Sequence, residues 1–104
     1  MNEIFIKNQK QLLNEFDSFV SDMRSIIENK SNDYGIHCWQ VLGIKGTFAD
    51  LNRKYWRIKS IVWDDIESKV TDEKLYETVV DLANHCFQMA AHIKNKGRTN
   101  DNCN

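Results

Sequence analysis

The sequence predicts an all-α protein, folded as a compact helical bundle of three long helices plus a short helical turn. None of the 104 residues is proline, a residue that commonly punctuates loops and β-rich folds. Apolar side chains recur at helical spacing in three long segments. The four glycines, Gly35, Gly43, Gly46 and Gly97, lie between or after these segments, where loops and helix ends use them.

The first expected helix covers about residues 8–29. Its apolar stripe consists of Leu12, Phe16, Phe19, Val20, Met23, Ile26 and Ile27. A bend at Asn32-Asp33-Tyr34-Gly35 should follow, because Asn and Asp favour turns and glycine permits positive φ. We expect the short helical turn at about residues 36–42.

The two later helices are expected to begin at threonines. Thr47 is a suitable N-cap, with Asp50 as its capping-box partner, and the stripe that follows is Leu51, Tyr55, Ile58 and Val62. Thr71 precedes two acidic residues that suit the positive end of a helix dipole. The stripe of that third helix is Leu75, Val79, Leu82, Cys86, Met89 and Ile93.

These segments predict one helical domain over residues 1–94 and a disordered tail over 95–104, which has no large apolar side chain. No apolar run is long enough to span a membrane, and the first residues lack the plan of a signal peptide. Three cysteines without paired spacing suit reduced thiols, so we expect a cytoplasmic protein. A formal net charge of -1 argues against long nucleic acids as partners.

Both later helices carry a second apolar flank. Trp56 and Trp63 share one flank, and Tyr76, Val80 and Phe87 share another. A helix that is apolar around most of its circumference is normally buried on two sides, which predicts a homo-oligomer. In the competing interpretation, Trp56 stacks on a ligand base and stays partly exposed.

The middle helix carries a basic face. Asp50, Arg53, Lys54 and Arg57 occupy its polar arc, either as a solvated face with local ion pairs or as a clamp for phosphate. Lys30 and Lys45 precede this helix and could converge on the same phosphate.

The last helix carries Glu73, Glu77 and Asp81 on one face. These carboxylates either pair with cations of the neighbouring helix, which we favour, or hold Mg²⁺ against a phosphorylated ligand. The adjacent pairs His37-Cys38 and His85-Cys86 lack zinc-site spacing, so we assign them structural roles.

In combination, these segments resemble the nucleotide modification associated domain family, small helical proteins of phages and Firmicutes genomes. The resemblance covers about residues 28–94 and rests on Asp33-Tyr34-Gly35, Leu42-Gly43, Arg53-Lys54, Arg57-Ile58 and Asp81-Leu82-Ala83-Asn84-His85. Three positions depart from the family pattern: Glu77 replaces an Asp, Lys74 a Ser and His85 a Tyr.

The resemblance implies a phage or prophage protein that contacts a nucleotide in the host cytoplasm. It places at or near the site Asp33, Tyr34, Arg53, Lys54, Arg57, Glu73, Glu77 and Asp81. A weaker similarity is to MazG-like all-α NTP pyrophosphohydrolases, whose Mg²⁺ cage needs carboxylates on two helices. Here Asp50 stands among basic residues instead, so we lean away from an enzyme.

The sequence thus predicts a nucleotide-binding protein that captures a phosphate-rich small nucleotide, with a signal of bacterial defence as one candidate. The alternatives are a Mg²⁺-dependent nucleotide pyrophosphohydrolase and an interaction module that inhibits a host enzyme. No cofactor other than Mg²⁺ is suggested.

Overall fold

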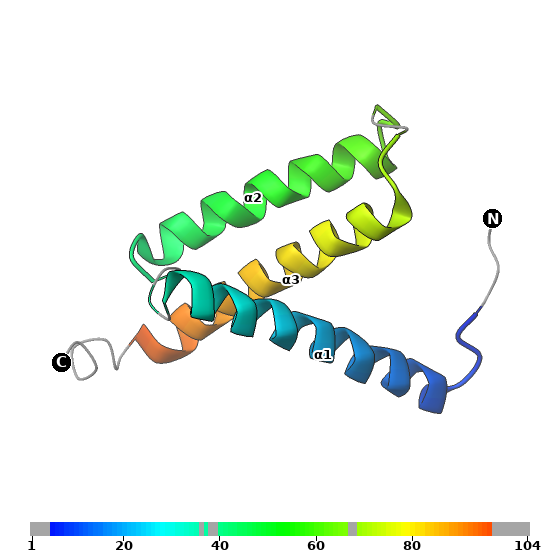
Figure 1. The fold of residues 1–104 in the computed structure, drawn as a ribbon, viewed down its shortest axis with the longest axis horizontal. Coiled ribbons are helices and arrows are strands. Elements are labelled where there is room, and N and C mark those ends of the chain that lie inside the picture. The colour runs from blue at the N-terminus through cyan, green and yellow to red at the C-terminus, as the bar shows by residue number, and fades with distance from the viewer. Residues whose placement is uncertain (1–4, 36, 38–39, 67–68, 97–104) are drawn as a thin grey trace.

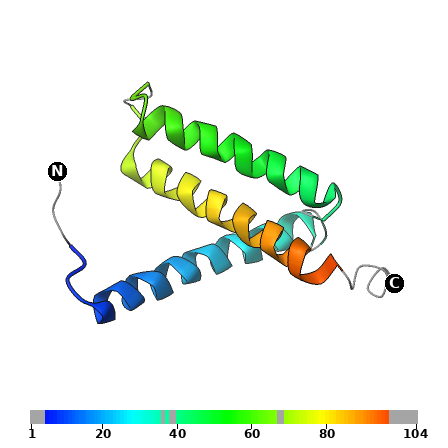
Figure 2. The same ribbon diagram turned by 180° about the vertical axis from the view of Figure 1, so that it is seen from behind.

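The fold consists of three long helices, seen in a computed structural model that describes residues 5–35, 37, 40–66 and 69–96. They are α1 (Gln9–Tyr34), α2 (Gly43–Val62) and α3 (Asp72–Asn95). Helices α2 and α3 lie side by side and antiparallel, and α1 crosses α3 (Figures 1 and 2). The predicted all-α bundle is therefore confirmed. None of these helices combines the length and apolar content that crossing a membrane requires.

Helices α1 and α3 begin with side-chain caps. The Oδ1 atom of Asn8 accepts a hydrogen bond from the backbone N–H of Gln11 at 2.9 Å. The Oγ1 atom of Thr71 accepts one from the N–H of Lys74 at 3.2 Å. Each cap satisfies a backbone donor that has no partner inside the helix. The predicted start of the third helix at Thr71 is confirmed.

The predicted start of the second helix at Thr47 is wrong. Helix α2 begins one turn earlier, at Gly43, whose N–H donates to the Gln40 carbonyl at 3.0 Å. Gly43 has φ +68°, a backbone conformation that glycine adopts without strain. Inside the helix, the Thr47 hydroxyl donates to the Gly43 carbonyl at 3.2 Å, the local bonding open to threonine within helices. Asp50 pairs with Arg53 instead of closing a capping box.

The first helix is longer than predicted, because Tyr34 is still helical and only Gly35 leaves the helix, with φ +87°. The Gly35 N–H donates to the Ser31 carbonyl at 2.9 Å. Of the helical turn expected at residues 36–42, the described residues 37 and 40–42 form a turn. The rest of that prediction, and residues 97–104 of the predicted tail, lie outside the described residues.

The core is small and centred on α3. Val80 is 1% exposed and is the one apolar side chain classed as buried among the described residues. Tyr76 packs its ring edge-on against Phe19 of α1, with ring centroids 6.1 Å apart. The α3 flank expected to face another subunit is therefore covered in part by α1. Two members of the predicted stripe, Cys86 and Ile93, are exposed instead.

Helix α1 is only partly packed against the rest of the chain. Residues 9–18 are all exposed, and this half of α1 diverges from α3 (Figure 1). The radius of gyration is 16.3 Å, against about 13 Å for a compact domain of this length. Close packing therefore holds for α2 with α3, while α1 contacts α3 along its C-terminal half.

We expect Val80→Ala to lower the free energy of unfolding by about 2 kcal/mol, because it removes two buried methyl groups and leaves a cavity. The same change at Val62, which is 62% exposed, should have almost no effect. Urea denaturation followed by circular dichroism measures both. Equal losses in the two variants would contradict this assignment of the core.

Candidate functional site

Asp81 of α3 is the point where charged groups from all three helices meet. Its Oδ2 atom lies 3.2 Å from the Nζ of Lys54 on α2. Its Oδ1 atom lies 3.9 Å from the Nζ of Lys30 on α1. The Lys54 and Asp81 side chains are only 20% and 21% exposed, so water screens this pair less than a surface pair. For Asp81, the predicted pairing with a cation of the neighbouring helix is confirmed.

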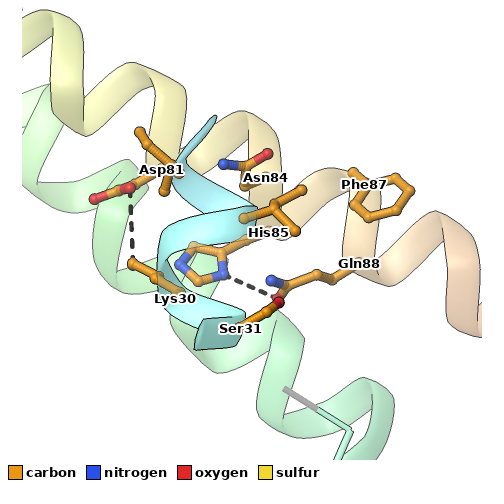
Figure 3. Close-up of a pocket in the computed structure, with 9 residues that line it drawn as sticks. Lys30, Ser31, Asp81, Asn84, His85, Phe87 and Gln88 are labelled. Carbon is orange, nitrogen blue, oxygen red and sulfur yellow. Dashed lines mark hydrogen bonds and ion pairs between the residues drawn. The ribbon is translucent and has the colours of Figure 1, made fainter. Parts of the chain in front are cut away.

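A small pocket lies beside this ion pair, between α1 and α3. Its cavity volume is about 50 Å³. In the close-up, polar side chains of α3 lie close to the C-terminal end of α1 (Figure 3). The lining residues are Ile26, Ile27, Lys30, Ser31, Asp81, Asn84, His85, Phe87 and Gln88. The pocket therefore combines apolar walls with cationic, acidic, amide and imidazole groups.

Asn84 is the buried polar residue of this pocket. Its side chain is 4% exposed, and its Nδ2 donates to the Met23 carbonyl of α1 at 3.3 Å. Its Oδ1 is buried and accepts no hydrogen bond from the described residues. A buried acceptor without a donor costs about 1–3 kcal/mol. Asn84 thus helps to join α3 to α1, and it contributes to the pocket lining while its Oδ1 is covered from solvent.

Two further polar side chains of α3 lie at the pocket as a pair. The Nδ1 of His85 and the Oε1 of Gln88 are 3.3 Å apart, a contact drawn in Figure 3. This distance places the ring N–H and the amide oxygen within hydrogen-bonding range when Nδ1 carries the proton. The pair, together with the Lys30 ammonium group, gives the pocket both donors and acceptors.

The basic face predicted on α2 lies away from this pocket, with the exception of Lys54. Arg53 pairs with Asp50 at 3.2 Å, and both side chains are well exposed. Trp56 is 53% exposed, with its ring edge-on to Tyr55 and the Lys59 Nζ 5.7 Å from its centroid. Arg53, Trp56 and Arg57 occupy positions i, i+3 and i+4, which share one helix face.

Other residues predicted at the site do not line the pocket. Asp33 and Tyr34 are exposed at the end of α1, and Tyr34 is 72% exposed. Glu73 is exposed, and Glu77 pairs with Lys74 at 3.9 Å. Within the described part of the chain, no group of three or more His, Cys, Asp or Glu residues could hold a metal ion. Mg²⁺ binding by Glu73, Glu77 and Asp81 stays a prediction.

Most of the pocket residues could not be predicted from the sequence. Asn84 follows the buried Val80 by one helical turn, so both lie on the packed face of α3. An amide within an otherwise apolar helix face was the signal that could have revealed it, because a buried amide needs partners. Ser31 and Gln88 carried no comparable signal, since polar residues near a helix end or on a mixed face are common.

Comparisons of the chain with protein-family models, with curated proteins and with solved structures give no match. The family resemblance inferred from the motifs therefore stays a prediction. The geometry of the described residues carries the functional argument.

The contact between α1 and α3 that forms the pocket should weaken at high pH. The Tyr76 hydroxyl donates a hydrogen bond to the Asp22 carboxylate of α1. This hydrogen bond, then burial, then the charges of Asp22 and Glu15 raise the pKa of Tyr76 above 10.0. A phenol whose pKa is higher in the folded state stabilises the fold below its unfolded pKa. That contribution disappears as the pH rises through the folded-state pKa.

We therefore expect the wild-type chain to lose its stability advantage over Tyr76→Phe as the pH rises above about 10. Chemical denaturation at several pH values measures the difference in unfolding free energy. Tyr34→Phe, at the exposed end of α1, is the matched control and should track the wild type throughout. A difference between wild type and Tyr76→Phe that stays constant with pH would contradict this role for Tyr76.

Proposed function

We propose that this protein binds a phosphate-bearing nucleotide at the junction of its three helices. The observation that carries the proposal is the convergence of the Lys30 and Lys54 ammonium groups on Asp81. This cluster lies beside a pocket that Lys30 and Asp81 line. Ligand sites typically combine apolar walls with a few convergent polar groups.

The polar groups suit two different parts of a nucleotide. Ammonium groups attract phosphate as point charges. When no ligand is bound, Asp81 holds the Lys30 and Lys54 ammonium groups in place. The His85 and Gln88 side chains at the pocket supply donors and acceptors for the edge of a nucleobase. In binding, phosphate oxygens would take over part of the Asp81 interaction with the lysines, so binding should weaken with salt.

The pocket volume limits how much of the ligand can enter. A cavity of about 50 Å³ is well below the roughly 300 Å³ of small ligand sites. One functional group, such as the amide edge of a base, would therefore enter, and the sugar and phosphates would lie along the surface towards the lysines. The proposal is compatible with a larger cyclic or modified nucleotide, including a defence signal captured by a phage protein.

The locations of the motifs support the proposal. Lys30 precedes the Asp33-Tyr34-Gly35 motif, Lys54 belongs to the basic motif, and Asp81 begins the late motif. These positions are far apart in the sequence, yet their charged groups converge on Asp81. We propose binding rather than turnover, because two lysines engage the carboxylate that a metal-dependent hydrolase would need for its metal.

A second candidate function, docking on another protein, is favoured by exposed tryptophans on α2. Trp63 is 81% exposed and Trp56 53% exposed, and tryptophan is enriched among residues that dominate protein interfaces. In that case a stable complex with a partner would form, and nucleotides would have no effect on the protein.

The nucleotide proposal can be tested by thermal shift and calorimetry with a panel of mono-, di-, tri- and cyclic nucleotides. At least one member should stabilise the wild-type protein. We expect Gln88→Ala and Lys30→Gln each to weaken its binding about tenfold, the effect of losing one hydrogen bond or charge contact.

Asn52→Ala and Lys69→Gln are the matched controls, because both residues are exposed and neither lines the pocket. Both should bind as the wild type does. No binding by any member at millimolar concentration would refute nucleotide binding. Loss of binding in Arg53→Gln with retention in Lys30→Gln would place the site on the α2 face instead.

A further inference from the structure

We propose that the exposed face of α1 binds the same face of a second copy of this chain, forming a two-fold dimer of antiparallel α1 helices. This outer face of α1 is defined by its exposed apolar residues, Leu12, Leu13, Phe16 and Val20. The inference is independent of nucleotide binding, because none of these residues lines the pocket.

The sequence of α1 has the apolar spacing of a coiled-coil helix. Positions separated alternately by three and four residues are Gln9, Leu12, Phe16, Phe19, Met23, Ile26 and Lys30. A heptad spacing of this kind keeps one seam of a helix against a partner. Leu13, Val20 and Ile27 add an apolar column beside that seam, repeating every seven residues. The apolar surface is therefore wider than one neighbouring helix covers.

The structure divides this wide surface into an inner and an outer part. On the inner part, Phe19 packs against Tyr76, and the Met23 carbonyl accepts a hydrogen bond from Asn84. On the outer part, Leu12, Leu13 and Phe16 are each more than half exposed. Helix α3 thus covers one side of the α1 stripe, and the outer side faces away from the described chain.

The exposed surface of the chain is larger than that of a compact monomer. A folded monomer of 12.2 kDa exposes about 6,100 Å², whereas this chain exposes 8670 Å². When the 17 residues outside the described ranges are counted as fully exposed, about 2,900 Å², the described residues still expose about 500 Å² more than a folded monomer of their size. This excess agrees with an apolar face of α1 that has no partner among the described residues.

A second copy fits this face because a two-fold axis makes the surface complementary to itself. Lys10 and Asp17 flank the outer face beside Leu13 and Val20, seven residues apart. An antiparallel pair centred between residues 13 and 14 places each Lys10 opposite Asp17 of the other copy. A pair centred on Asp17 would instead oppose Lys10 to Arg24, a like-charge contact. Charge therefore selects the first register.

Sedimentation velocity at low to high micromolar concentration tests the proposal. The wild-type chain should sediment as a dimer, and Phe16→Glu should shift it to monomer with its helical circular dichroism largely kept. Trp63→Glu is the matched control, since it places the same charge on another exposed aromatic. It should leave the dimer intact. A monomeric wild type, or a Trp63→Glu variant that alone dissociates, would overturn the assignment of this face.

A charge swap tests the antiparallel register. Lys10→Glu and Asp17→Lys should each raise the dimer dissociation constant about three- to tenfold, and the double variant should restore it to near the wild-type value. The double variant recreates both opposite-charge contacts with the signs exchanged. Additive weakening in the double variant would overturn this register. Nucleotide titration of monomeric Phe16→Glu separates the two proposals, because we expect its pocket to bind as in the wild type.

Discussion

The Asp81 carboxylate joins all three helices, because it meets a lysine from each of the other two. Helix α3 packs against both α1 and α2, whereas no backbone contact between α1 and α2 occurs in the described residues. One side chain on the central helix therefore carries charge contacts to both neighbours. With Val80 as the one fully buried apolar side chain described, the fold has a small apolar core to supplement these polar contacts.

The packed face of α3 carries both apolar and polar contact residues within two helical turns. Val80 supplies the apolar contact, Asp81 the ion pairs and Asn84 a hydrogen bond to the backbone of α1. The polar groups that join the helices are thus also the groups that line or border the pocket. A ligand that engages them would act on the helix junction itself, which links ligand binding to stability by mass action. The α1 stripe is packed on one side only, and the assembly surface that we propose there is separate from this junction.

Helix number and type could be predicted from the sequence because apolar periodicity and the Thr71 cap are local signals. The start of α2 was missed because a threonine can cap a helix or bond within it, and the turn before Gly43 decides between them. The site was predicted only in part. The sequence predicts Lys54 and Asp81 as residues at or near the site, and their pairing follows from opposite charges on neighbouring helices. The role of Asn84 could not be predicted, because it depends on which face of α3 meets α1. Apolar residues occur around most of the circumference of α3, so the sequence does not single out that face.

The central claim is that Asp81 couples α3 to its neighbours, and a double-mutant cycle between Lys54→Met and Asp81→Asn tests it most directly. The unfolding free energies of the wild type, both single variants and the double variant give the coupling energy. We predict a coupling of about 1 kcal/mol for this partly buried pair. The corresponding cycle with Lys30→Met should give a smaller value, because that contact is longer and more exposed. Additivity within about 0.3 kcal/mol for Lys54 and Asp81 would contradict the account.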